Sequence, residues 1–260
     1  MVGKLLARGM LAGIVAGLLT FGFARIVGEP SVDQAISFEE KMAEDHAQHE
    51  HADAPAGAAH EHEHEEELVS RATQAGLGLF TGVAVYSAAI GGLFALVYAY
   101  AYGRAGSFSA RALSAWLALA AFIAIVIVPN LKYPANPPSI GDPETIGYRT
   151  GLFFLMIAIS IAAAVFSLKA RRHAMARFGA WNGSILAAGI FVAIIAAVQI
   201  ALPAINEVPA AFPAALLWKF RMAAIGMQAI MWSTIGLLFG ALAERLETRQ
   251  YRHLNQEART

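Results

Sequence analysis

The hydrophobic residues of this chain are gathered into blocks of about twenty, and this distribution constrains the fold more than any other feature. Hydrophobic residues make up 57% of the 260 residues. A helix of about twenty apolar residues spans the roughly 30 Å hydrocarbon core of a bilayer. The blocks therefore predict an all-α integral membrane protein, a bundle of about six transmembrane helices. We expect these helices at residues 1–27, 72–102, 113–131, 146–168, 181–205 and 216–243.

The first block carries small residues on one face. Gly9, Gly13 and Gly17 recur every four residues, a spacing that lets two membrane helices approach closely. Lys4 and Arg8 precede the block, so a cleaved signal peptide is the alternative interpretation. The apolar stretch is long for a signal peptide, and no clear small-x-small cleavage site follows it. We therefore favour an uncleaved helix.

Residues 28–71 interrupt the apolar pattern, and we expect them to form a disordered external loop rich in His and Glu. Six of the eight histidines lie in its His/Glu tract, residues 46–67, which reads HAQHEHADAPAGAAHEHEHEEE. Imidazole and carboxylate together suit zinc, nickel, cobalt and copper. The alternative is a solvated loop whose composition has drifted without a metal role. The candidate metal ligands are His46, His49, His51, His60, His62, His64, Glu61, Glu63 and Glu65.

The charge distribution is uneven, although the formal net charge is zero. Of the 19 acidic residues, 13 lie between Glu29 and Glu67, where Lys41 is the only basic residue. Such a segment concentrates cations and is a poor ligand for nucleic acid. The chain has no cysteine, which excludes thiolate metal sites and disulfides.

Basic residues predict the orientation in the membrane. With six crossings, four segments lie on one side of the membrane: the N-terminus, residues 103–112, residues 169–180 and the tail 244–260. Together they carry 12 of the 19 Lys and Arg residues. The other connections carry the remaining 7. Basic residues favour the cytoplasmic side. We therefore expect a membrane protein with both termini and the tail in the cytoplasm and residues 28–71 outside.

Two proline-containing connections on the expected outer side hold the unusual polar residues. Four of them, Asp142, Glu144, Asn206 and Glu207, could line the mouth of a cation pathway. The alternative is that paired acidic and basic groups hold the connections onto the bundle. Asp142 followed by Pro143 also predicts a helix N-cap with proline in the first turn.

The predicted spans offer few polar groups. Gln199 and Gln228 are expected to form interhelical hydrogen bonds, and Met227 and Met231 to pack. The chain lacks a P-loop, an HExxH motif and any histidine in the middle of a span. The sequence therefore gives little support to an enzyme or to a permanently bound cofactor.

Three segments together resemble the CbtA family, the proposed large subunit of a bacterial cobalt transporter. They read MVGKLLARGMLAGIVAGLLTFGFARIVGEP, KYPANPPSIGDPETIGYRT and NEVPAAFPAALLWKFR. The resemblance covers nearly the whole chain, and KYPANPP is its most specific part. It implies Co²⁺ as the transported ion, uptake that feeds cobalamin synthesis, and a small single-helix partner, CbtB. The His/Glu tract is the least family-like part.

The function we predict is therefore that of a membrane subunit of a divalent-metal uptake system, with Co²⁺ first among the candidate ions and the His/Glu tract gathering the ion. A non-transporting, membrane-anchored protein that binds or senses zinc, nickel or copper is the alternative. A membrane enzyme is a weaker one.

Overall fold

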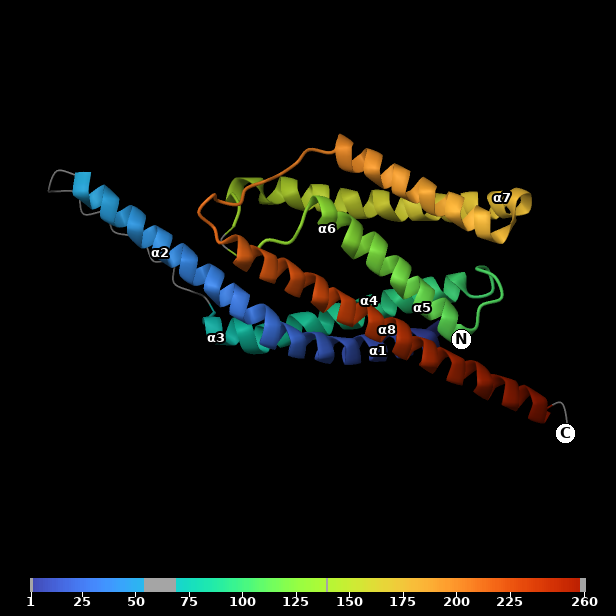
Figure 1. Cartoon of the computed structure of the whole chain (residues 1–260). Coiled ribbons are helices and arrows are strands. Elements are labelled where there is room, and N and C mark those ends of the chain that lie inside the picture. The colour runs from blue at the N-terminus through green and yellow to red at the C-terminus, as the bar shows by residue number, and fades with distance from the viewer. Residues whose placement is uncertain (1, 54–68, 139, 258–260) are drawn as a thin grey trace. The chain divides into compact units, whose positions relative to one another are not determined.

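The computed structural model describes residues 2–53, 69–138 and 140–257 (Figure 1). For residues 45–53, 249–255 and 257 it describes only the backbone. The described residues form helices and connections without any strand, which confirms the prediction of an all-helical chain. They include five helices that are long and apolar enough to cross a membrane: Val2–Glu44, Arg71–Ala101, Ala110–Lys132, Pro143–Ala201 and Ala214–Thr248.

The chain forms two compact units. The first unit comprises residues 1–97, 136–140 and 209–234. The second comprises residues 98–135, 141–208 and 235–260. Each unit is thus made of three segments that are distant in the sequence. The helices α4 (Leu79–Ala101) and α8 (Ala214–Glu257) each contribute residues to both units.

In the first unit, α1 (Val2–Phe23) packs against α4 along the predicted small face. A Cβ atom on Gly13 would lie 2.9 Å from the Cα atom of Ala88, and one on Gly17 would lie 3.3 Å from the Cβ of Ser87. The helices run antiparallel, since the contacts of α1 move backwards along α4. The glycines therefore mediate a contact within the chain, as small residues do between membrane helices.

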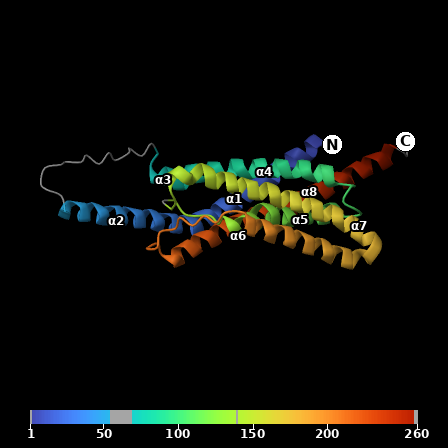
Figure 2. The ribbon, with the colours of Figure 1, turned by 90° about the horizontal axis from the view of Figure 1, so that it is seen from above.

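A continuous helical path leads out of α1. The π-helical turn η1 (Ala24–Gly28) joins α1 to α2 (Glu29–Asp53), and Figures 1 and 2 show α2 extending onward from α1. The prediction of a disordered loop is therefore wrong for residues 29–53. This stretch contains five Glu and four Ala residues, which favour helix, and it extends a helix that already exists. Residues 54–68 of the expected loop 28–71 lie outside the described residues.

The helical path resumes at Ser70, whose side chain caps the short helix α3 (Arg71–Thr73). A second π-helical turn, η2 (Gln74–Gly78), joins α3 to α4. On the other side of the first unit, the Phe23 ring packs on Gly226 of α8, and the rings of Phe94 and Trp232 lie 6.4 Å apart.

The second unit contains a continuous helical segment whose middle part is a π-helical turn. It consists of α5 (Ala110–Ala121), the π-helical turn η3 (Phe122–Ile127) and α6 (Val128–Lys132), which contains Pro129. The middle of α8 packs on α5, where the Ser114 hydroxyl donates to the Gly236 carbonyl at 2.6 Å. Close contact is made by glycine again, since a Cβ on Gly240 would lie 3.0 Å from that of Ser114.

The longest helix, α7 (Ile146–Ala201), doubles back on itself (Figures 1 and 2). Its 56 residues would span about 84 Å at 1.5 Å per residue, far more than one crossing. Gly179 has φ 80° and ψ 169°, a conformation that glycine adopts readily, and it reverses the chain. We expected the connection between two crossings at residues 169–180, and the reversal lies inside that range; the basic residues before Gly179 are helical, so the turn is confined to one glycine.

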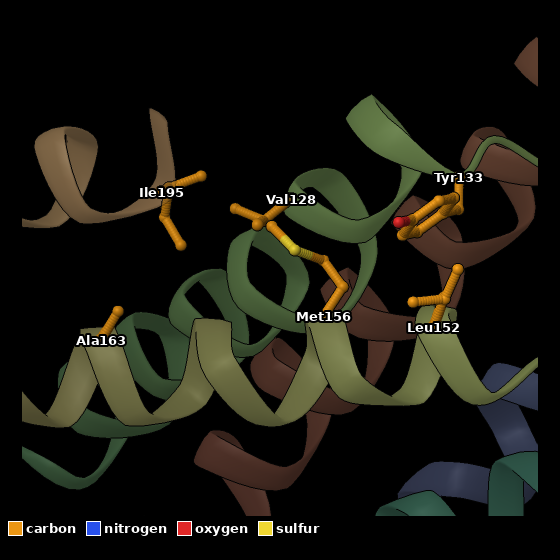
Figure 3. Packing of buried hydrophobic residues seen from close by; sticks show 6 residues of the cluster. All are labelled: Val128, Tyr133, Leu152, Met156, Ala163 and Ile195. Carbon is orange, nitrogen blue, oxygen red and sulfur yellow. The ribbon is translucent and has the colours of Figure 1, made fainter. Parts of the chain in front are cut away.

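The two halves of α7 enclose a core with α6. Figure 3 shows Met156 and Ala163 on the first half, Ile195 on the second and Val128 on α6. Met156 is completely buried. At the closed end of the hairpin, the Arg171 Nε donates to the Ser184 hydroxyl at 2.9 Å. The packing therefore holds α7 as a helical hairpin.

Candidate functional site

The predicted metal-binding residues of the His/Glu tract are not placed by the structure. His46, His49 and His51 belong to α2 by their backbone, but their side chains lie outside the described part of the chain. The remaining six lie wholly outside it: His60, Glu61, His62, Glu63, His64 and Glu65. Within the described residues, no group of three or more His, Cys, Asp and Glu is arranged to hold a metal ion.

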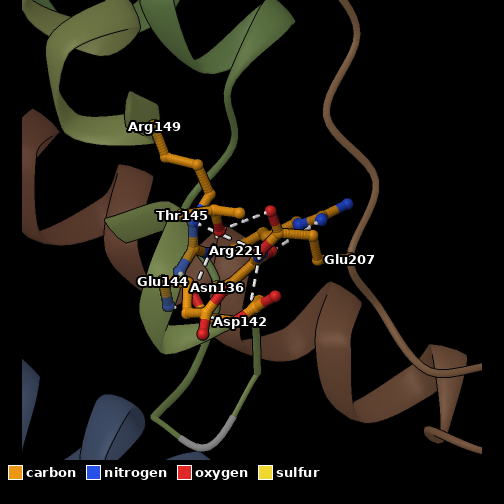
Figure 4. A network of polar contacts seen from close by, with 7 residues as sticks. All are labelled: Asn136, Asp142, Glu144, Thr145, Arg149, Glu207 and Arg221. Carbon is orange, nitrogen blue, oxygen red and sulfur yellow. Dashed lines mark hydrogen bonds and ion pairs between the residues drawn. The ribbon is translucent and has the colours of Figure 1, made fainter. Parts of the chain in front are cut away.

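Three of the four predicted mouth residues meet in the second unit (Figure 4). Asp142 caps the short 3-10 helix η4 (Pro143–Thr145) by accepting from the Glu144 amide at 2.9 Å, which confirms the predicted N-cap. The Asp142 amide in turn donates to Glu207 Oε2 at 3.0 Å. The side chains of Glu144 and Asn206 are exposed. The network therefore joins the connection before α7 to the connection after it.

Glu207 is the centre of this network. Its Oε1 accepts from the Thr145 hydroxyl at 2.7 Å, and its Oε2 lies 3.2 Å from the Arg149 Nε. These groups lower the pKa of Glu207, with the Thr145 hydrogen bond as the largest cause; the Asp142 amide and the Arg149 charge add to it, while desolvation opposes it. Glu207 is therefore held as an anion whose charge Arg149 offsets.

Arg149 occupies its place because residue 141 is a glycine. Gly141 has φ 116°, in the region that favours glycine. A Cβ atom there would lie 2.6 Å from Arg149 Nη2 and 2.7 Å from its Cζ. Arg149 Nη2 also lies 3.3 Å from the Asp142 carbonyl, to which it donates. The guanidinium group therefore packs directly on the backbone of the connection.

The KYP sequence of the same connection joins α6 to the end of α7. Pro203 has no amide hydrogen, so the Gln199 carbonyl lacks its usual partner four residues on. Lys132 Nζ donates to that carbonyl at 2.6 Å, and the Tyr133 hydroxyl donates to the Pro203 carbonyl at 2.9 Å. The Gln199 amide donates to the Val128 carbonyl at 3.1 Å, which confirms its predicted interhelical hydrogen bond.

Figure 4 also shows a contact of the first unit. Arg221 Nη2, on α8, donates to the Asn136 side-chain oxygen at 2.9 Å. Arg221 is half-buried near the start of the helix. The NPP part of the KYPANPP motif is thus attached to α8 through Asn136. The KYP part is attached to the end of α7 through Lys132 and Tyr133. Most of the unusual polar residues of these connections therefore act as donors or acceptors between chain segments.

A further polar cluster was missed by the sequence analysis. Arg71, at the start of α3, forms ion pairs with Glu29 and Asp33 of α2. The Asp33 Oδ1 accepts from Arg71 Nη2 at 2.9 Å and from its Nε at 3.2 Å. The sequence pattern that could have indicated these ion pairs is two acidic residues spaced four apart, followed by a basic residue at the start of the next helix.

Helices and connections without strands, and five long apolar helices among the described residues, define a multi-pass membrane protein. The chain belongs to the CbtA family: the model of that family, described as "Probable cobalt transporter subunit (CbtA)", matches residues 2–244. The resemblance drawn from the sequence is thus confirmed over nearly the whole chain. That description names a transporter subunit and not an enzyme. A search of curated proteins finds no match to the chain, and a search of solved structures finds none either.

Proposed function

We propose that the chain is the inner-membrane subunit of a system that takes up a divalent transition metal, with Co²⁺ as the substrate. The observation that carries this proposal is the family match over residues 2–244. The description of the family as a transporter subunit also supports the participation of a partner. A small CbtB-like membrane protein is the partner we propose.

The proposed topology has six crossings, with α7 crossing twice as a hairpin. Contacts within each unit support the expected sides. In the first unit, the Phe38 ring of α2 lies 5.1 Å from that of Phe212, in the connection before α8. In the second unit, Arg172 donates to the Arg104 carbonyl at 3.0 Å, which joins two connections expected in the cytoplasm. These pairings agree with the sides assigned from basic residues.

In this topology α2 and the His/Glu tract lie outside the cell. The tract gathers cations from dilute solution, because it combines imidazoles with a high density of carboxylates. The ion then enters near the connections that carry Asp142, Glu144, Asn206 and Glu207. Of these, Glu144 and Asn206 are exposed and available to a passing ion, whereas Glu207 is engaged by Thr145 and Arg149.

The membrane potential is sufficient to drive this uptake. A charge crossing 100 mV gains about 2.3 kcal/mol, so a divalent cation gains about 4.6 kcal/mol. That free energy corresponds to a concentration ratio of roughly 10³. No nucleotide hydrolysis by this chain is required. The described spans offer no cluster of carboxylates and imidazoles for a dehydrated ion, so the ion crosses largely hydrated or with ligands from the partner.

Uptake of radioactive cobalt tests the proposal in cells whose other cobalt importers are deleted. Cells that express the chain with its partner should accumulate the ion, and cells without the gene should not. Deleting residues 42–67, so that Lys41 is joined to Leu68, should reduce uptake at scarce cobalt and spare it at abundant cobalt. Loss of uptake at all concentrations would contradict a gathering role. Metal binding by the chain without any flux would favour the anchored alternative.

A further inference from the structure

The basic residues at the closed end of the α7 hairpin follow directly on the apolar part of the helix (Figures 1 and 2). Residues 150–168 carry no charged side chain, and at 1.5 Å per residue they span about 28 Å, close to the thickness of a hydrocarbon core. Lys169 is the first charged residue after them, and residues 178–206 are again free of charge. The Lys and Arg residues between these two stretches therefore lie at the boundary between membrane and water.

These basic residues have no carboxylate to balance them. The sequence contains no Asp or Glu in residues 145–206, and none in residues 68–141, which include the neighbouring connection with Arg104. In the part of the chain that the structure describes, no ion pair involves the basic residues of α7 or Arg104. Arg111, at the start of α5, is by contrast paired with Glu244 at 2.7 Å. The closed end of the hairpin therefore carries an excess of positive charge.

A single face of α7 presents this charge. Lys169, Arg172 and His173 are spaced by three and four residues, so they share a face of the first half of the helix, and all three are exposed. Arg172 Nη2 donates to the Arg104 carbonyl at 3.0 Å, which joins the connection after α4 to this face. We call Arg104, Lys169, Arg172 and His173 the basic face. A guanidinium has several N–H donors and an ammonium has three, so most donors of this face remain for an acceptor outside the chain.

Exposed aromatic rings flank the basic face. Trp181 is 78% exposed and Tyr100 is 72% exposed, and Phe178 is exposed as well. The Arg104 guanidinium lies 5.1 Å from the centroid of the Tyr100 ring, and that of Arg177 lies 5.6 Å from the centroid of the Phe178 ring. Exposed Trp and Tyr are typical of the membrane–water interface, where their rings lie at the depth of the lipid headgroups.

The basic face continues into an exposed apolar face. Ile161 and Val165 precede Lys169 by eight and four residues, so they lie on the same side of α7, toward the middle of the membrane. Both side chains are exposed. One side of the helix therefore offers hydrogen-bond donors and positive charge at the interface, with apolar surface directly beside them in the hydrocarbon region.

We propose that the basic face binds the headgroup of an anionic phospholipid, with Lys169 and Arg172 donating to its phosphate oxygens. Guanidinium and ammonium groups form charge-assisted hydrogen bonds with phosphate. The acyl chains of the lipid lie along Ile161 and Val165, and a soluble phosphate ion has no group to fill that place. Basic surfaces beside membrane helices bind anionic headgroups in this way. The bound lipid fastens the closed end of the hairpin to the connection after α4, whichever ion the protein transports.

Lipid titration of the full chain in detergent tests this proposal. Native mass spectrometry counts the lipids that stay bound as phosphatidylglycerol, or phosphatidylcholine with the same acyl chains, is added. The parent should bind its first phosphatidylglycerol several times more tightly than its first phosphatidylcholine. Lys169→Gln and Arg172→Gln should each weaken phosphatidylglycerol binding about fivefold, the equivalent of about 1 kcal/mol per basic residue near a membrane surface. Neither change should affect phosphatidylcholine.

Lys169→Gln keeps the test decisive if Arg172→Gln fails to fold. Arg172 also holds the Arg104 carbonyl, whereas Lys169 is exposed and only its carbonyl, an acceptor for His173, takes part in a side-chain contact. An unchanged affinity for phosphatidylglycerol in Lys169→Gln would therefore overturn the proposal. Equal affinities of the parent for the two lipids would overturn it as well.

Arg245→Gln is the matched control for the loss of one positive charge. Arg245 is exposed, but on α8 it has Glu244 and Glu247 close by in the sequence, so its charge is balanced. Its substitution should leave the affinity for phosphatidylglycerol unchanged. A weakening equal to that in Lys169→Gln would show that the lipid responds only to the net charge of the protein, and would contradict a site on α7.

Sodium phosphate separates the two possible sources of a phosphate group. At an ionic strength matched with sodium chloride, it should displace phosphatidylglycerol no better than chloride does, because the lipid is held by its chains as well as by its headgroup. Displacement by phosphate alone would show that the basic face binds the free ion, and would overturn the assignment to a lipid.

Discussion

The environment of Glu207 limits what this single residue can do. Both carboxylate oxygens are already engaged, one by the Thr145 hydroxyl and the other by Arg149 and the Asp142 amide. A cation that bound Glu207 would have to displace the Arg149 guanidinium and break charge-assisted contacts. The contacts of Glu207 therefore favour a structural role, in which it joins the connections before and after α7, over the binding of a passing ion.

The lowered pKa of Glu207 predicts a pH dependence of stability. Because the folded state holds this carboxyl below its ordinary pKa of 4.5, its contribution is fully present above that value. The contribution is lost as the pH falls through the lower, folded pKa. Glu207→Gln should therefore be less stable than the parent at pH 7, and the difference should shrink below about pH 4.

Thermal unfolding in detergent between pH 7 and pH 3 measures this difference. Thr145→Val removes the largest cause of the lowered pKa, so it should move the loss of stability to higher pH. A difference between the parent and Glu207→Gln that stays constant across the whole range would contradict the assignment.

Gly141 predicts a second effect at the scale of one residue. Gly141→Ala places a Cβ atom against the Arg149 guanidinium at a φ of 116°. We expect a loss of about 1–3 kcal/mol in the free energy of unfolding. Gly147→Ala is the matched control, because no atom lies within 4 Å of the Cβ it would add. Thermal unfolding of both variants checks this, and equal stabilities would contradict it.

At the scale of elements, the contact of α1 with α4 depends on the absence of side chains. A Cβ atom on Gly13 would lie 2.9 Å from the Cα of Ala88, too close for any rotamer to relieve. Gly13→Ala should therefore push the helices apart and cost about 1–3 kcal/mol. Gly22→Ala lies on the same helix with open space around its Cβ and should be tolerated. The yield of monodisperse protein and its thermal unfolding measure the difference.

The elements themselves were predictable only where the chain is apolar. The hydrophobic blocks predicted helices in the regions where the structure has them, and the glycine spacing of α1 predicted a close contact. The helix over residues 29–53 was not predicted, because the high charge of this stretch is typical of a disordered loop. Its helix-forming residues instead continue the helix of α1. The reversal at Gly179 lies inside the connection expected at residues 169–180, but it is shorter than expected, because the Lys and Arg residues before Gly179 continue the helix.

The candidate site was harder to predict than the elements. The N-cap at Asp142 follows from its neighbour Pro143, and so it could be predicted locally. The pairs of Arg71 with Glu29 and of Lys132 with the Gln199 carbonyl join residues 42 and 67 positions apart. No local pattern specifies such partners, because they depend on how the helices pack.

At the scale of the whole molecule, the central prediction concerns orientation. Single cysteines at Ala56 and Gln256 can be labelled with an impermeant thiol reagent on intact cells. Ala56 should react and Gln256 should react only after the membrane is opened, because basic residues favour the cytoplasm. The chain has no native cysteine to interfere. Labelling of Gln256 but not of Ala56 on intact cells would reverse the topology and place the His/Glu tract inside.

The one-residue reversal in α7 also bears on how proteases meet this protein. Proteases cut segments that can leave the fold and become extended, so exposed loop tips are the usual sites. Lys169, Arg171, Arg172 and Arg177 all precede Gly179 in regular helix, and the reversal leaves no loop between the two halves. Trypsin added to inside-out vesicles should therefore leave the hairpin as a single fragment, although four of its cleavage sites lie within ten residues of the reversal.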